Sequence, residues 1–159
     1  MRICFTADQN RGLDSVLSYH FGHCPYFVIV DVDESGNVKN VESIPNPLMG
    51  KHAPGELPAF MKSKGVNVII TGGMGPKAQQ YFASYGIRTI VGAYGRIKDV
   101  LEEYLQQKIN YVSPTIEETH SEGQAESDEV TRLKKEVAFL REEIADLKSL
   151  LKKLEEKLK

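Results

Sequence analysis

The sequence predicts an α/β domain built on a mixed sheet, followed by a C-terminal coiled coil. Two patterns in the 159 residues indicate this arrangement. Over roughly the first 110 residues, short apolar runs come first in succession and then alternate with helical patterns, an order typical of a mixed sheet with flanking helices. In the last 30 residues, apolar side chains recur every three and four positions, which is the spacing of a coiled coil.

Five segments have the composition of strands. Residues 2–7 alternate, with Ile3, Phe5 and Ala7 on one side. Residues 27–32 and 38–43 flank a short Asp-Glu-Ser-Gly-Asn turn, which predicts an antiparallel hairpin. Residues 66–71 are continuously apolar, as expected of a strand covered on both faces, and residues 88–91 form a short fifth strand.

Three amphipathic segments predict helices over 56–64, 76–85 and 97–107. Pro76 fits a first helical position, and Gly86 ends the second helix. The resulting order, β-β-β-α-β-α-β-α, predicts an antiparallel meander joined to parallel strands by right-handed crossovers. Four prolines in residues 44–58 predict an irregular surface loop.

The remaining chain divides into a linker and a dimerisation helix. The domain is assigned to residues 1–112. Residues 113–129 hold six carboxylates and no Lys or Arg, which predicts a flexible acidic linker. Residues 130–159 carry an unbroken heptad repeat at Val130, Leu133, Val137, Leu140, Ile144, Leu147, Leu151, Leu154 and Leu158.

The heptad composition favours a parallel homodimer. β-branched residues at a with Leu at d favour two parallel strands. In that arrangement Glu129 meets Lys134, Glu136 meets Arg141, and Glu143 meets Lys148, so these flanking charges attract. A buried Asn that would fix the oligomeric state is missing from the repeat, so a trimer remains open.

Composition excludes several function classes. The net charge of −2 and the lack of a basic segment in the domain argue against nucleic-acid binding. The sequence contains no 18-residue apolar run, which argues against a membrane span, and no secretory pattern, so we expect a cytoplasmic protein. Two cysteines 20 positions apart are then expected to be reduced thiols.

The stretch from Tyr19 to Phe27 concentrates candidate ligands. It contains His20, His23 and Cys24, and imidazole and thiolate groups suit soft and borderline metals. His23 and Cys24 are the candidate metal ligands. The alternative is that Cys24 is a small buried apolar residue and His23 a solvated loop residue. Cys4 lies within a predicted strand and is expected in the core.

A second candidate is the glycine loop of Gly72, Gly73, Met74 and Gly75. Its backbone could approach an anion at the start of the following helix, or it could simply form a tight strand-to-helix turn. Met74, expected to be exposed between glycines, would be a soft contact for a cluster. A dinucleotide site is rejected because the next strand is not followed by an acidic residue. Catalytic carboxylate groups and nucleophile triads do not stand out either, so we expect no enzyme.

Several of these motifs together resemble the dinitrogenase iron–molybdenum cofactor biosynthesis family, which includes NifX-type proteins and the C-terminal segment of NifB-type proteins. The resemblance covers about residues 1–110. The matching pieces are residues 18–27, the Asn46-Pro47 loop reaching His52 and Gly55, Gly72–Gly75 with Ala78, and Gly86-Ile87. It implies a ribonuclease-H-like fold without that fold's catalytic carboxylates.

The resemblance also implies a function. Family members bind iron–sulfur or iron–molybdenum cluster precursors and carry them between assembly and target proteins. The family pattern points to His23 for cofactor binding, with Cys24 and His52 as additions. His20 stands where the family commonly has Arg, and the coiled coil is not a general family feature.

We therefore expect a non-enzymatic carrier of such a cluster, with donor and acceptor proteins as partners. The cluster would lie on the face formed by residues 21–25, the proline-rich loop and residues 72–75. One His and one Cys per chain fall short of the usual four protein ligands, so the cluster would bring its own sulfides or be shared by two chains. The alternative function is a scaffold assembled by the coiled coil, whose pocket holds a small anion or nothing.

Overall fold

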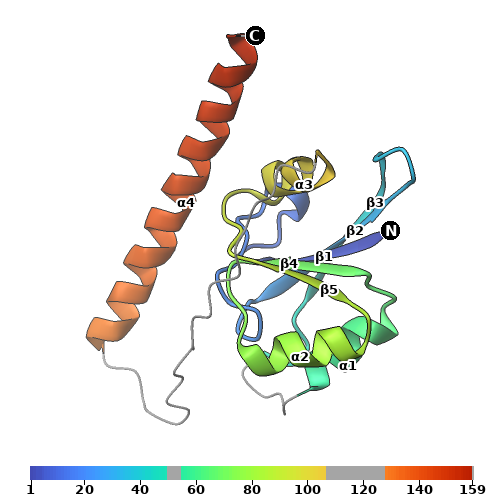
Figure 1. Cartoon of the computed structure of the whole chain (residues 1–159). Coiled ribbons are helices and arrows are strands. Elements are labelled where there is room, and N and C mark those ends of the chain that lie inside the picture. Colours follow the sequence, from blue (N-terminus) through green and yellow to red (C-terminus); the bar gives the residue numbers. More distant parts are fainter. Residues whose placement is uncertain (50–54, 107–127, 159) are drawn as a thin grey trace.

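The computed structural model describes residues 1–49, 55–106 and 128–158 (Figure 1). The predictions for His52, for most of the acidic linker and for the end of the third helix lie outside these residues.

A five-stranded mixed sheet forms the centre of the domain. Its strands are β1 (Arg2–Ala7), β2 (Tyr26–Val32), β3 (Val38–Pro45), β4 (Val68–Thr71) and β5 (Arg88–Val91), in the order β3-β2-β1-β4-β5. β2 runs antiparallel to both β1 and β3, whereas β4 is parallel to β1 and to β5. The predicted meander joined to parallel strands is therefore confirmed.

Three strand boundaries differ from the sequence prediction, and one of them, the start of β2 at Tyr26, differs by a single residue. β4 begins at Val68 rather than at Val66, because the amide of Val66 donates to the carbonyl of Met61 and so closes the preceding helix. β3 continues to Pro45, inside the segment predicted to be irregular. It lies at the sheet edge, where a residue without an N–H is tolerated.

The helices cover both faces of the sheet (Figure 1). They are α1 (Glu56–Ser63), α2 (Pro76–Ser84) and α3 (Ile97–Leu105), with a short 3₁₀ turn at Gly12–Asp14. The helix α4 (Asp128–Lys157) stands beside the domain and begins two residues before the predicted repeat. None of the helices in the described ranges is long and apolar enough to span a membrane.

The alternation of side chains along the strands builds two apolar layers. Ile3 and Phe5 of β1 face α3, where they pack with Ile97 and Val100. Cys4, between them, faces the opposite layer, which includes residues of α1, α2 and the loop before β2. The prediction that Ile3, Phe5 and Ala7 share one side, with Cys4 in the core, is confirmed.

Candidate functional site

Two buried side chains anchor the loop that leads into β2. Phe21 is 6% exposed, and its ring centroid lies 5.2 Å from that of Phe82 on α2 and 6.2 Å from that of Phe27 on β2. Cys24 is 1% exposed and belongs to the same apolar layer. Burying a side chain such as Phe21 stabilises a fold by about 1.5–3 kcal/mol, so these anchors hold the loop firmly.

Asn46 fastens the same loop through its polar groups. Its side-chain amide donates to the carbonyl oxygens of Cys24, at 2.9 Å, and Gly22, at 3.2 Å. Its backbone amide donates to the carbonyl of Pro25 at 2.9 Å. Asn46 is only 8% exposed, so the carbonyl groups of a non-regular loop are satisfied away from water.

The thiol of Cys24 points into this packed region. It donates to the carbonyl oxygen of Phe21 at 3.1 Å. Burial raises the pKa of Cys24 to about 12, so the group is a thiol near neutral pH. Metals bind the thiolate. In this conformation Cys24 is an anchor of the loop, and its sulfur becomes a metal ligand only if the loop opens.

Cys4 lies in the same buried layer, on β1. It is fully buried, and burial raises its pKa well above the usual range, with the neighbouring Cys24 as a second cause. Both cysteines are free.

The two histidines of the loop lie on its outer side. His23 is exposed and His20 is partly buried. Their ring centroids are 6.3 Å apart, with the rings nearly perpendicular, and His20 packs edge-on to Tyr19 at 5.3 Å. Two imidazoles this close can reach neighbouring atoms of one bound cluster.

A charged pair, Asp8 and Arg141, borders the same loop. Asp8 follows β1, and its partial burial raises the pKa of its carboxyl, an effect opposed by Arg141. The guanidinium of Arg141, on α4, lies 3.8 Å from that carboxylate and 5.5 Å from the ring centroid of Tyr19. It also donates to the carbonyl of Leu17 at 3.2 Å. From the sequence, Arg141 is expected only at the flank of the coiled coil. No local pattern indicates its contacts with residues more than 120 positions earlier in the chain.

The glycine loop packs against the histidine loop and does not form an open cradle. A Cβ on Gly72 would lie 2.8 Å from the Cα of Tyr19, and one on Gly73 would lie 2.6 Å from the carbonyl oxygen of Tyr19. The backbone amide of Gly72 donates to the carbonyl oxygen of Ser18 at 3.0 Å. These two positions therefore need glycine so that two backbones can touch.

The expectation for Met74 is wrong with respect to exposure. Met74 is 3% exposed, because its side chain turns into the layer that contains Phe21, Cys24 and Phe82. Gly75, in contrast, has open space where a side chain would be. Of the four predicted residues in this loop, Gly75 is thus the one with room beside it.

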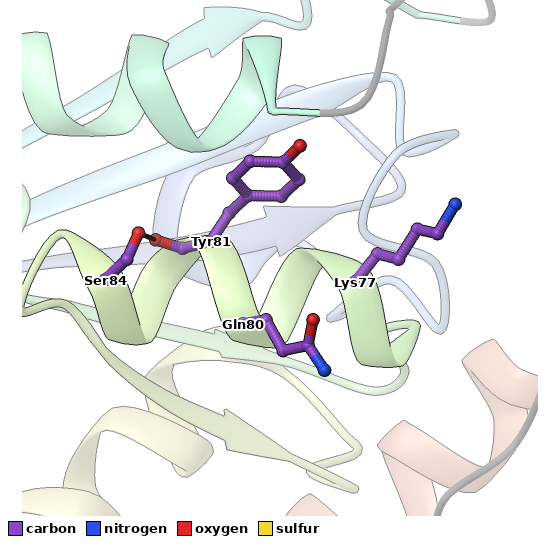
Figure 2. Close-up of a pocket in the computed structure, with 4 residues that line it drawn as sticks. All are labelled: Lys77, Gln80, Tyr81 and Ser84. Atoms are coloured by element: carbon purple, nitrogen blue, oxygen red, sulfur yellow. Dashed lines mark hydrogen bonds between the residues drawn. The ribbon is translucent and has the colours of Figure 1, made fainter.

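A separate surface hollow lies on α2. It has a volume of about 530 Å³ and is lined by Lys77, Gln80, Tyr81 and Ser84, which all project from that one helix (Figure 2). Ser84 Oγ donates to the carbonyl of Tyr81. The hollow does not include His20, His23 or the glycine loop, so it is not the predicted site.

Across the described part of the chain, no group of three His, Cys, Asp or Glu side chains is placed to hold a metal ion. The loop geometry alone therefore does not identify a ligand.

The profile of the dinitrogenase iron–molybdenum cofactor family matches residues 1–107. The chain belongs to this family.

Individual proteins are similar to the same part of the chain. An uncharacterized protein from Methanocaldococcus jannaschii is 36% identical over 111 residues, covering 69% of this chain and 89% of the relative. The crystal structure of PH0822 is 41% identical with a TM-score of 0.61, and covers 67% of this chain and 92% of its own.

Two further solved structures share the fold. The apo form of the orange protein from Desulfovibrio gigas is 27% identical, with a TM-score of 0.57, over 67% of this chain and 88% of its own. The NMR structure of TM1290 from Thermotoga, described as a candidate NifB protein, is 23% identical, with a TM-score of 0.60, over 74% and 97% of the two chains. The family match ends before α4 begins.

Proposed function

We propose that this protein is a non-enzymatic carrier that binds a preassembled iron–sulfur or iron–molybdenum-type cluster as cargo, with His23 as the principal protein ligand. The observation that carries the proposal is the exposed imidazole of His23 beside that of His20, on a loop of a domain from the iron–molybdenum cofactor family.

The anchoring of the loop suits a carrier. The loop backbone is fixed by the buried side chains of Phe21 and Cys24 and by the hydrogen bonds of Asn46. His23 is therefore held in place without a metal. A ligand on a rigid loop loses little conformational freedom when it binds. The site is thus ready to accept cargo and can release it without unfolding.

The number of protein ligands also favours cargo over a resident cofactor. An iron–sulfur cluster built into a protein is usually held by four side chains. Within the described residues the loop offers two imidazoles, while the thiol of Cys24 is buried and protonated. A cluster that already carries its own sulfides needs fewer protein ligands. His52 of the proline-rich loop remains a candidate for a further contact.

The test is uptake under anaerobic conditions by the full-length protein. One probe is ferrous iron with sulfide, and the other is tetrathiomolybdate, which brings its own sulfur ligands. Visible absorption and metal per chain are measured for the wild type and for His23→Ala, His20→Ala, His52→Ala and Cys24→Ser. His120→Ala, in the segment assigned to the linker, is the matched histidine control.

We expect His23→Ala to lose at least tenfold in affinity for the cluster, and His120→Ala to bind like the wild type. Cys24→Ser should keep binding if it keeps its fold. Equal uptake by the wild type and His23→Ala would contradict the role of His23. Loss of uptake in a folded Cys24→Ser variant would show instead that the loop opens and exposes the thiol.

A scaffold function is the second candidate, and the exposed apolar side of α4 favours it. If the wild type takes up neither probe, assembly through α4 becomes the better account of the protein.

A further inference from the structure

We infer that α4 is fixed to its own domain by one face and binds the α4 of a second copy of this chain by another, in a parallel two-stranded coiled coil. This inference does not depend on the cargo, because the apolar heptad residues of α4 on which it rests include no residue of the histidine loop.

One face of α4 is packed against the domain through polar contacts. Ala145, in the middle of the helix, is completely buried. Lys148 pairs with Glu103 at 2.9 Å, and Ser149 Oγ donates to the buried carboxylate of Asp99 at 2.5 Å. These contacts are joined by ion pairs from Arg96 to Asp146 and from Lys152 to Glu102. Together they fix the rotation of the helix about its own axis.

The heptad stripe faces away from the domain. The stripe comprises the nine apolar a and d residues, and each of them is at least 41% exposed. They are Val130, Leu133, Val137, Leu140, Ile144, Leu147, Leu151, Leu154 and Leu158. A continuous exposed apolar surface of this kind marks an interaction site. The helix therefore exposes its apolar side while its polar side contacts the domain, the reverse of an ordinary surface helix.

The spacing of the stripe identifies the occupant. Apolar residues at strict three- and four-residue intervals match a second helix with the same repeat, because each side chain then fits between four side chains of the facing helix. The stripe is therefore complementary to itself. Val and Ile at the first three a positions, with Leu at every d position, favour two strands.

The flanking charges give the orientation. Glu136 and Glu143 border one side of the stripe, while Arg141 and Lys148 border the other. A parallel pair places Glu136 of one copy beside Arg141 of the other, and Glu143 beside Lys148. An antiparallel pair sets like charges together at several of these positions.

Arg141 and Lys148 already contact their own domain, at Leu17 and Tyr94 respectively. A guanidinium has five N–H donors and an ammonium three, so each cation can also serve a glutamate of the second copy. These two side chains therefore lie at the border of both interfaces.

The test is the mass of the full-length chain by sedimentation equilibrium over a dilution series. We expect twice the chain mass for the wild type. Leu140→Lys/Leu147→Lys removes two d residues and should reduce the mass twofold, to that of one chain. Phe139→Lys changes a residue that is 61% exposed on the same helix but outside the stripe, and it should leave the dimer intact. Circular dichroism establishes that each variant is folded.

Orientation is measured with an introduced cysteine. Leu154→Cys at a d position should form an interchain disulfide on mild oxidation, because equivalent d residues meet in a parallel pair. Glu156→Cys, on the far side of the helix, should not. A wild-type monomer, a trimer, or a dimer in which Leu154→Cys fails to cross-link would overturn the inference.

Discussion

The backbone of Tyr19 lies directly against that of Gly73, so closely that an added Cβ would lie 2.6 Å from the carbonyl oxygen of Tyr19. We expect Gly73→Ala to destabilise the fold by about 1–3 kcal/mol, because neither backbone can move without disturbing its loop. The free energy of unfolding in urea measures this effect.

Gly75→Ala provides the control, since open space surrounds Gly75 and its φ of −68° suits any residue. Ala lowers the conformational entropy of the unfolded chain, which stabilises the folded protein by about 0.4–1 kcal/mol. Ala is also a poorer helix N-cap than Gly, which opposes this gain. The net change should be small. Equal losses for both variants would mean that Tyr19 and Gly73 are not in tight contact.

The amide of Asn46 is expected to control access to the thiol of Cys24. Asn46→Ala leaves the carbonyls of Gly22 and Cys24 without their donor, which costs about 1–3 kcal/mol. The loop then opens more often, and Cys24 should react faster with a thiol reagent under native conditions. Asn40→Ala, at an exposed position of β3, is the control and should leave the reaction rate unchanged. A rate that does not change in Asn46→Ala would contradict this role.

Stability should fall at alkaline pH because of Cys24. Its pKa is raised from an ordinary 9.0 to about 12 in the folded protein, so between these values the unfolded chain loses a proton that the folded chain keeps. Increasing pH therefore favours unfolding, by at most about 1.4 kcal/mol per pH unit, and below pH 9 this contribution is constant. Urea denaturation from pH 7 to 11 measures the slope.

Cys24→Ala should show a shallower decline over the same range, since Cys4 is then the only cysteine left to titrate. Identical slopes in the variant and the wild type would show that the thiol of Cys24 is accessible to water in the folded protein.

The attachment of α4 should depend on Arg96, whose side chain is 13% exposed and pairs with Asp146 and Glu142. Arg96→Met is expected to weaken the attachment by about 1 kcal/mol, a factor of about five in its equilibrium constant. Hydrogen exchange of α4 amides should quicken accordingly, and added salt should reduce the difference between variant and wild type. Lys98→Met, in which only the exposed pair with Asp14 is lost, should exchange like the wild type.

Sequence patterns predicted the sheet well because its signals are local. The alternation at Ile3, Phe5 and Ala7 and the turn between β2 and β3 depend on neighbours in the chain. The same is true of Pro76 and Gly86 around α2. The start of β4 is less well predicted, because the amide of Val66 donates to the carbonyl of Met61 at the end of α1, and apolar composition alone does not show where that helix closes.

The sequence selects a candidate loop but not the arrangement of its side chains. His20, His23 and Cys24 mark this loop as chemically unusual, yet which of their side chains face outward depends on the packing of Phe21 and Phe82. Met74 was assigned to the surface because its neighbours are glycines, whereas those glycines serve the contact with Tyr19. The role of Arg141 at the edge of the loop required the fold.

The burial of Asp99 beneath Ser149 has a consequence for how the chain is made. Synthesis proceeds from the N-terminus, and N-terminal elements fold first. All five strands have therefore left the ribosome before Ser149, which lies 50 residues beyond Asp99, is available to bond to it. During that interval water solvates the carboxylate of Asp99. The surface around α3 is completed only after α4 has been synthesised, so the nascent domain has to remain folded without this helix until then.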